Sequence, residues 1–350
     1  MNLIDFSYLK KIYPKAKEIN LNGRWITLSD IEPLIEKLKS TLNTTKLGRS
    51  EEKRTIYKLM FGTGDKKILI WSQMHGNEST GTKAVFDFLN FISKNISNNI
   101  TQTIINNCTL IIVPILNPDG AQVYTRVNAN NVDLNRDAVD KKAKESKLLR
   151  SLLDEFQPHF CFNLHDQRTI FGVENTQNPA AISFLAPSEE ETRAITKGRK
   201  HTMNVIVAMN SILQKIIPNH IGRYTDEFYP TATGDNFQKL GYNTILIEAG
   251  HYPNDYKREK VREYNFYALL QGIYHIASEN DFSNYKDYFT IPNNQTNFFD
   301  VIHRDLNNKK DTAYQYVESI KDGTFVLSLE KKEEGNLSKY LAHKEIFIEN

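Results

Sequence analysis

A histidine and a glutamate lie three residues apart in the segment His75-Gly-Asn-Glu78. The apolar run at residues 68–71 predicts a buried strand before them, and the periodicity of residues 81–92 predicts an amphipathic helix after them. An imidazole and a carboxylate at such a turn can share one cation, and zinc accepts both. A surface histidine beside a helix N-terminus, where a carboxylate is favourable, explains the same pair. The pair alone leaves both interpretations open.

A second histidine follows another apolar run. His165 ends the segment at residues 160–164, which predicts a further buried strand. Ligands of open α/β sheets bind at the carboxyl ends of the strands, so His165 is expected near His75. A hydrolytic zinc site needs three protein ligands and a position for water, which makes His165 the candidate third ligand. Without its companions it is more typical of a structural histidine.

A glutamate also ends an apolar strand late in the chain. Residues 243–247 predict a buried strand, and Glu248 follows them. A carboxylate there is costly unless it is paired or functional. Beside a zinc-activated water it can accept a proton as a general base and return it as a general acid. An ion pair with Arg136 or Lys239 is the structural alternative.

An amide and a guanidinium stand side by side at Asn135 and Arg136, within the segment Val132-Asp-Leu-Asn-Arg-Asp137. A guanidinium fork can hold a carboxylate through two parallel charge-assisted hydrogen bonds. An isolated pair of this kind is more typical of a surface loop. The preceding Asn117-Pro-Asp-Gly120 predicts a turn after a strand and by itself indicates no chemistry.

The order of these motifs resembles that of the zinc metallocarboxypeptidases, the carboxypeptidase A-like or funnelin family. The resemblance runs from about Leu28 to Tyr274. It implies one zinc ion per chain, held by His75, Glu78 and His165, and it implies that Glu248 is the general acid/base.

The resemblance also implies roles for the residues between the metal ligands. Asn135 and Arg136 would hold the terminal carboxylate of the substrate, and Arg126 would stabilise the oxyanion. Asp133 would orient His75 from behind the metal. Asp166 departs from the pattern, because many relatives carry serine there.

The family's mobile tyrosine precedes the strand of the catalytic glutamate. Both Tyr224 and Tyr229 lie in that segment, and Tyr229 is favoured. Asp235 lies near the stretch that lines the specificity pocket in relatives, where an acidic residue would favour lysine, arginine or diaminopimelate at the end of the substrate. A solvated loop aspartate explains Asp235 as well.

These residues predict a zinc-dependent metallocarboxypeptidase that hydrolyses the C-terminal peptide bond of a peptide with a free carboxylate, through a zinc-activated water. The first alternative is a zinc-dependent deacylase of N-acyl amino acids, similar to aspartoacylase or the desuccinylases. A deacylase closes the acyl side of its pocket, whereas a carboxypeptidase leaves room for a chain. The second alternative is a non-catalytic zinc- or carboxylate-binding module, against which Glu248 argues.

Helices alternate with apolar strands along the chain, which predicts an α/β fold. The resemblance adds a mixed, mostly parallel eight-stranded sheet flanked by helices. Helices are expected at about residues 30–42, 189–216 and 258–278, and a capping box at Ser29-Asp-Ile-Glu32 would open the first. Residues 1–280 would form the catalytic domain. Residues 281–350 would form a linker and a small β-rich region, with short strands at 313–317, 324–329 and 346–348.

Composition narrows the class of partner and the location. The chain of 350 residues carries 44 basic and 42 acidic residues, so no nucleic-acid partner is expected. No apolar run approaches the roughly 20 residues that span a bilayer, so no membrane partner is expected. Six charged residues between Asp5 and Glu18 interrupt any secretory signal, which predicts a cytoplasmic protein. The oligomeric state cannot be predicted. Cys108 and Cys161 lie in or beside apolar strands, which favours reduced packing roles.

Overall fold

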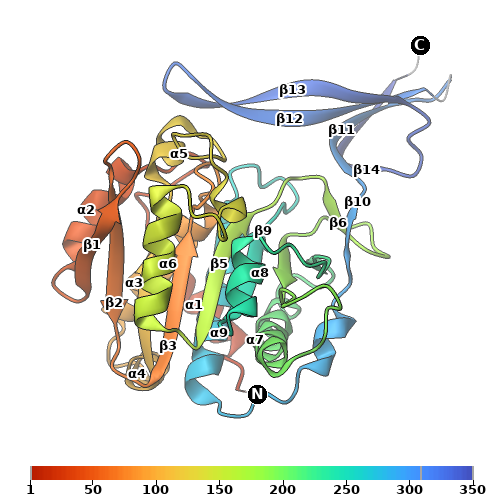
Figure 1. Cartoon of the computed structure of the whole chain (residues 1–350). Coiled ribbons are helices and arrows are strands. Elements are labelled where there is room, and N and C mark those ends of the chain that lie inside the picture. Colours follow the sequence, from red (N-terminus) through yellow and green to blue (C-terminus); the bar gives the residue numbers. More distant parts are fainter. Residues whose placement is uncertain (1, 308–309, 349–350) are drawn as a thin grey trace.

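A mixed eight-stranded sheet forms the centre of the computed structural model, which describes residues 2–307 and 310–348 (Figure 1). The strand order in these residues is β1-β2-β4-β3-β5-β9-β7-β8. The strands are β1 (Asn43–Arg49), β2 (Thr55–Phe61), β3 (Lys66–Ser72), β4 (Cys108–Val113), β5 (Phe160–Asp166), β7 (Ile182–Leu185), β8 (Ile221–Arg223) and β9 (Asn243–Ala249). The pairings from β4 through β3 and β5 to β9 are parallel, as is that of β7 with β8. The remaining pairings are antiparallel, so the predicted mixed, mostly parallel sheet is confirmed.

Helices cover both faces of this sheet (Figure 1). Ile68 and Ile70 of β3 pack into the larger core, whereas Leu69 and Trp71 pack into the smaller core on the other face. Because both faces are buried, the central strands are continuously apolar rather than alternating. The larger core takes side chains from α1 (Phe6–Ala16), α2 (Leu28–Leu38), α3 (Thr80–Lys94), α4 (Asn99–Asn107), α7 (Lys197–Leu213) and α9 (Glu259–Ser278), and the smaller from α6 (Lys144–Phe156) and α8 (Thr233–Lys239).

The helix boundaries differ in part from the expected ones. Helix α2 begins earlier than predicted, because Thr27 rather than Ser29 is its N-cap and forms the capping box with Asp30. The sequence offers both residues with an acidic residue three positions later, and only the packed structure selects one. The expected helix at 189–216 is shorter, since α7 spans Lys197–Leu213, and the expected helix at 258–278 is confirmed as α9.

A second sheet follows near the C-terminus, with the order β13-β12-β11-β14 in the described residues. Its strands are β11 (Phe298–Asp305), β12 (Asp311–Lys321), β13 (Thr324–Gly335) and β14 (Leu341–Ile348). The predicted β-rich region is therefore confirmed, although its strands are longer than expected and β11 was not predicted. The domain boundary at residue 280 stays a prediction.

The segment expected to be a linker packs on the main body. It contains the short helix η2 (Lys286–Thr290) and β10 (Asn294–Thr296), which pairs with β6 (Phe171–Val173). Tyr288 of η2 is buried, and its hydroxyl accepts a hydrogen bond from the backbone of Ala186. Within residues 2–307 and 310–348, no helix is both long and apolar enough to cross a bilayer. Cys108 and Cys161 are buried free thiols.

Candidate active site

Three adjacent parallel strands bring the candidate catalytic residues together. His75 follows β3, His165 lies near the end of β5, and Glu248 lies near the end of β9. His165 and Glu248 are direct partners in the β5–β9 register, so their side chains emerge on the same face of the sheet. The expectation that strand ends would gather these residues thus agrees with the geometry.

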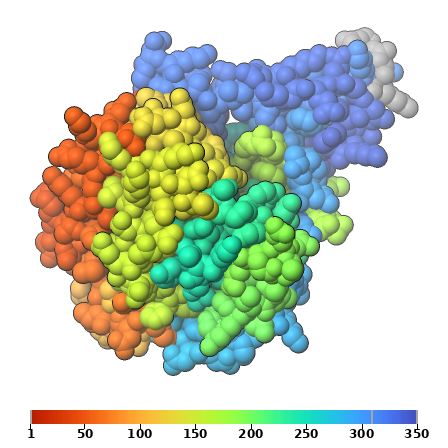
Figure 2. Space-filling view, in the orientation of Figure 1, coloured from red at the N-terminus to blue at the C-terminus, as the bar shows by residue number. Residues whose placement is uncertain are grey.

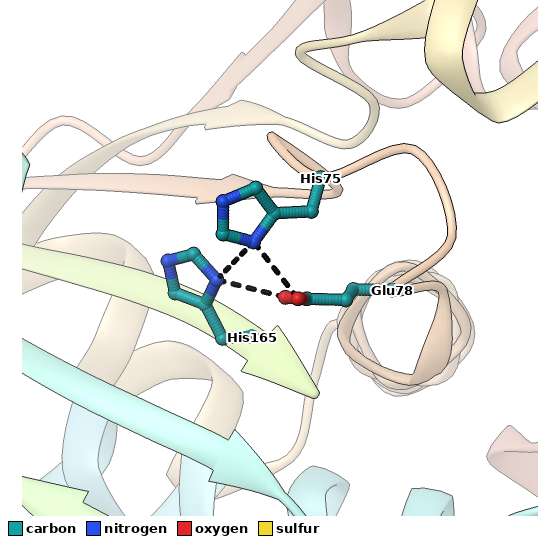
Figure 3. A group of neighbouring side chains, drawn as sticks. All are labelled: His75, Glu78 and His165. Carbon is teal, nitrogen blue, oxygen red and sulfur yellow. Dashed lines mark hydrogen bonds and ion pairs between the residues drawn. The ribbon is translucent and has the colours of Figure 1, made fainter. Parts of the chain in front are cut away.

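The two imidazoles and the carboxylate of Glu78 converge on one point (Figure 3). The Nδ1 atoms of His75 and His165 lie 3.1 Å apart, and each lies 2.8 Å from an oxygen of Glu78. Ligand atoms at the usual 2.0–2.1 Å from a tetrahedral zinc ion are roughly 3.3 Å from one another. The spacing and the donor set therefore fit zinc, and all three side chains are buried.

The turn that carries His75 and Glu78 is held by the Asn117-Pro-Asp-Gly120 segment, which begins α5 (Pro118–Val123). The Asn117 side chain donates to the carbonyl of Met74 at 3.2 Å and accepts from the backbone of Gly120 at 2.9 Å. A Cβ atom on Gly76 would lie 2.0 Å from the backbone of Gly120, so only glycine permits this approach. Sequence reasoning missed this supporting role, because a turn motif does not reveal what it packs against.

Asp133 contacts the ring nitrogen of His75 that faces away from Glu78 and His165. Its Oδ1 lies 3.0 Å from Nε2 of His75, and its Oδ2 accepts from Nε of Arg126 at 3.0 Å. A proton on Nε2 leaves the Nδ1 lone pair free for a metal, which is the usual arrangement for a carboxylate behind a histidine ligand. Arg126 also reaches Glu78, at 3.3 Å, and its side chain is 46% exposed.

The charge on Glu78 is favoured by its neighbours. Although burial acts to raise its pKa, the imidazoles of His75 and His165 lower the pKa of Glu78 well below its ordinary value. The backbone N–H of Asp166 also donates to Glu78, at 3.0 Å. The buried carboxylate of Glu78 is therefore anionic, which is the form that a metal would require.

The carboxylate of Glu248 differs from that of Glu78 in its hydrogen bonding. Its Oε2 atom has no hydrogen-bond partner among the described residues. Burial, together with the negative charges of Glu78 and Asp166, raises the pKa of Glu248 well above its ordinary value. Within the described chain, neither Arg136 nor Lys239 forms an ion pair with Glu248, so the structural alternative for this residue has no support.

Asn135 and Arg136 lie on the short helix η1 (Leu134–Arg136), which Asp133 caps. The Asn135 side chain is fixed by the backbone N–H of Thr233, at 3.0 Å. The guanidinium of Arg136 donates to the carbonyl of Asn135 at 2.7 Å and has no acidic partner in the residues that the structure describes. An exposed guanidinium without a counter-ion is available to a carboxylate ligand.

The structure separates the two candidate tyrosines. Tyr224 lines the same cavity as the histidines, whereas Tyr229 is 48% exposed and does not line it. The Tyr229 hydroxyl lies 3.0 Å from Glu227. The substrate-binding role of Tyr229 stays a prediction. Asp235 is buried and accepts from the backbone of Tyr229 at 3.1 Å, so it is not a solvated loop residue, and it does not line the cavity either.

A cavity of about 640 Å³ encloses these groups. Its walls include the candidate residues His75, Glu78, Arg126, Asn135, Arg136, His165 and Glu248. They also include residues from the second sheet, which sequence reasoning assigned no role: Gln315, Tyr316, Val317, Glu318, Leu327 and Lys332. No local sequence signal marks these residues, because only long-range docking brings them to the site.

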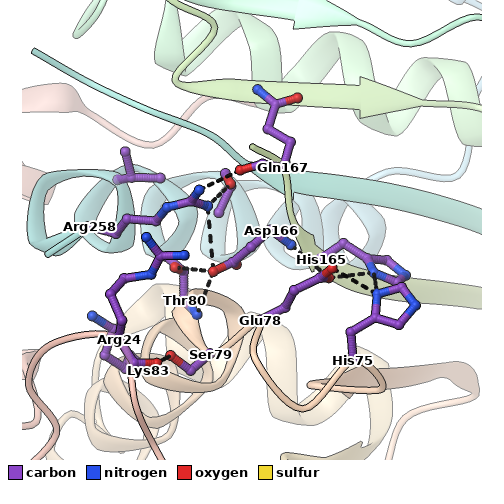
Figure 4. A network of polar contacts seen from close by, with 12 residues as sticks. Arg24, His75, Glu78, Ser79, Thr80, Lys83, His165, Asp166, Gln167 and Arg258 are labelled. Atoms are coloured by element: carbon purple, nitrogen blue, oxygen red, sulfur yellow. Dashed lines mark hydrogen bonds and ion pairs between the residues drawn. The ribbon is translucent and has the colours of Figure 1, made fainter. Parts of the chain in front are cut away.

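Buried charged side chains lie beside His165 and Glu78 (Figure 4). Asp166, next to His165, accepts a hydrogen bond from the Thr80 hydroxyl at 2.7 Å and lies 3.5 Å from Arg258. Arg24 lies on the same side, and its carbonyl accepts from the hydroxyl of Ser79, the neighbour of Glu78. Burial raises the pKa of Asp166, and the guanidinium groups of Arg258 and Arg24 oppose that rise.

The sequence between residues 28 and 337 matches the family model described as zinc carboxypeptidase. The chain belongs to the zinc carboxypeptidase family. Among curated relatives, carboxypeptidase SOL1 of Arabidopsis thaliana is 29% identical over 137 residues, which are 35% of this chain and 28% of that protein. This zinc carboxypeptidase homologue spans about a third or less of the length of the first curated relatives that it matches.

Solved structures of this family share the fold. The metallo-carboxypeptidase of Burkholderia cenocepacia has a TM-score of 0.59 at 16% identity, and the match covers 72% of this chain and 69% of that one. Carboxypeptidase A of Helicoverpa armigera has a TM-score of 0.55 at 15% identity, with 77% and 80% covered. The eight-stranded sheet with its helices is therefore the fold of the zinc carboxypeptidases.

Proposed function

We propose that this protein is a zinc-dependent carboxypeptidase that hydrolyses the C-terminal peptide bond of a peptide with a free carboxylate. The observation that carries the proposal is one cavity with three complementary parts. These parts are the His75–Glu78–His165 cluster, the unpartnered carboxylate of Glu248 and the unpaired guanidinium of Arg136. Family membership supports the same reaction. We further propose one zinc ion per chain, because the described residues offer one such cluster.

Zinc bound by His75, Glu78 and His165 would polarise the scissile carbonyl and make water a nucleophile at neutral pH. Glu248 would take the proton of the attacking water on its free Oε2 atom. It would then deliver that proton to the leaving amine nitrogen. Burial and the negative charges of Glu78 and Asp166 raise its pKa, which makes it a stronger base for this double role.

The two arginines would act on opposite ends of the C-terminal residue. Arg126 is held by Asp133 and Glu78 beside the metal ligands, where it would donate to the oxygen that gains negative charge. Arg136, with the Asn135 amide beside it, would bind the terminal carboxylate and so restrict cleavage to the last peptide bond. No further residue of the described cavity is needed for these steps.

A comparison of free-acid and amidated peptides tests the proposal. The wild-type chain should cleave the free acid at least about tenfold faster than the amide, because a charged hydrogen bond contributes about 1.5–3 kcal/mol. Arg136→Ala should lose most of this preference. Arg168→Ala is the matched control, since Arg168 lines the same cavity. Equal rates on acid and amide would contradict exopeptidase action, and turnover of N-acyl amino acids without turnover of peptides would favour the deacylase.

A further inference from the structure

The hairpin formed by β12 and β13 (residues 311–335) crosses the mouth of the cavity. Figure 1 shows this hairpin lying along the end of the main body, and Figure 2 shows it against the surface of the yellow segment that contains α5. Its middle part lines the cavity through Gln315, Val317 and Leu327. These residues lie far along the chain from the metal ligands, so tertiary docking alone holds them there.

The middle of β12 is held against the main body through a buried carboxylate of the neighbouring strand β11. Asp300 of β11 is 0% exposed. It accepts hydrogen bonds from the hydroxyl of Tyr256 at 2.9 Å, the hydroxyl of Thr169 at 3.1 Å and the backbone N–H of Tyr316 at 2.8 Å. The rings of Tyr256 and Tyr316 also meet edge to face, with centroids 5.0 Å apart. Main body and hairpin thus share one buried polar group.

A second group of contacts lies two residues further along β12 and continues toward the turn of the hairpin. Glu318 of β12 forms an ion pair with Arg24 at 2.8 Å and accepts from the hydroxyl of Tyr124 at 2.7 Å. Arg24 is only 5% exposed, and Glu318 is its ion-pair partner among the described residues. The ring of Tyr124 lies 5.3 Å from that of Phe325 on β13.

A hairpin that these two groups of contacts hold against the main body is a fixed cover of the cavity rather than a mobile flap. Asn135 and Arg136 are held elsewhere, by η1 and the start of α8, and would take the C-terminal residue of the substrate. The part of the cavity under the hairpin is therefore left for the acyl side of the scissile bond. A volume of about 640 Å³ is that of a pocket for a small molecule.

We propose that the β12–β13 hairpin restricts this enzyme to short peptides by limiting the acyl side of its site to a few residues. The inference rests on the proposed carboxypeptidase activity and names the substrate class for it. A peptide with one or a few residues before the scissile bond fits beneath the hairpin. A long peptide or the C-terminus of a folded protein collides with it.

A length series of peptides tests the inference on the full chain. All members carry the same two C-terminal residues as a free acid, with N-terminal extensions from none to about eight residues, which fully extended span at most roughly 29 Å. kcat/KM should fall at least tenfold between the short members and the longest member. Hydrolysis of long and short members within about twofold of each other would overturn the inference and leave the proposed function standing.

Two matched variants locate the effect on the hairpin. Leu327 lines the cavity, whereas Leu329 lies on the same strand and does not. Leu327→Ala should raise the long-to-short ratio of kcat/KM by at least threefold, and Leu329→Ala should leave that ratio unchanged. If the long-to-short ratio of kcat/KM changes equally in both variants, or changes in neither, the proposed role of the hairpin is contradicted.

Binding measurements keep the two proposals distinguishable. If no member of the series is cleaved by zinc-loaded protein, the proposed function fails. The affinities of the same peptides, measured by titration calorimetry, then decide the inference. Affinity that falls at least tenfold with length supports a limited acyl side, and affinity independent of length overturns the inference.

Discussion

Replacing Glu248 by glutamine distinguishes a catalytic carboxylate from a structural one. Glutamine keeps the size and much of the shape of the side chain but cannot act as a base at neutral pH. Loss of general acid–base catalysis costs a factor of about 100 to 10,000, so kcat should fall by at least about 100-fold. In free energy this is about 2.7 kcal/mol or more of lost transition-state stabilisation.

The structure also predicts the effect of this change on stability. Oε2 of Glu248 has no hydrogen-bond partner that the substitution could remove. The charge of Glu248 faces the negative charges of Glu78 and Asp166, so neutralising it removes a repulsion. The metal-free variant should therefore melt at the same temperature as the wild type or a higher one.

Glu145 supplies the matched control. It is also buried, but its carboxylate accepts from the backbone of Glu51 and from the side chain of Asn128, each at 3.0 Å. In Glu145→Gln the new amide N–H2 opposes one of these donors, which costs about 1–3 kcal/mol. That variant should melt several degrees lower and keep its kcat.

The assay measures kcat on a saturating free-acid peptide, the melting temperature and the zinc content of each variant. Opposite signatures are expected: Glu248→Gln loses turnover and keeps stability, and Glu145→Gln does the reverse. A Glu248→Gln protein that is less stable but keeps its kcat within about threefold would refute the reasoning. The zinc cluster would remain, and another base would have to be sought in the cavity.

Further predictions concern the metal ligands and one buried carboxylate. Elemental analysis should find one zinc per wild-type chain, little in His165→Ala, and a full equivalent in His159→Ala, whose ring lies outside the cluster beside the backbone of Lys67. Asp133→Asn should weaken zinc binding roughly 10- to 100-fold in a chelator competition, because the partner of His75 is altered. Burial raises the pKa of Asp235 to about 6, above its unfolded value near 3.9, so its stabilising contribution is complete below about pH 4 and is lost as the pH rises through 6. Denaturant titrations of Asp235→Asn across pH 4–7 should lack this loss, and an unchanged profile would contradict the raised pKa.

Local sequence patterns are sufficient to predict that His75, His165 and Glu248 lie close together. Each follows or ends a run of buried apolar residues, and the carboxyl ends of neighbouring parallel strands meet at one edge of a sheet. Their adjacency is therefore a consequence of topology and needs no knowledge of individual contacts. The proposed chemistry of the cluster then follows from the donor types alone.

The hairpin could not be placed in this way. Its strands were recognised from their apolar and β-branched residues, but nothing in residues 311–335 indicates that they cover the cavity. The contacts that fix them involve Arg24, Tyr124 and Thr169, which belong to separate loops and helices of the main body. Such pairings depend on the arrangement of the complete fold, since each partner alone is a common polar residue.

The hairpin supplies a carboxylate that compensates a buried positive charge next to the candidate site. Arg24 and Arg258 are buried beside the metal ligands, and a buried guanidinium without a counter-ion costs several kcal/mol. Asp166 lies against Arg258, and Glu318 of the hairpin pairs with Arg24, so each cation has its own carboxylate. Without Glu318 the buried guanidinium of Arg24 would lose its ion-pair partner and keep only the charge of Asp166 nearby, while its carbonyl accepts from Ser79, the neighbour of Glu78. The docked position of the hairpin is therefore linked through Arg24 to the turn that carries Glu78, so a change at Glu318 should affect both.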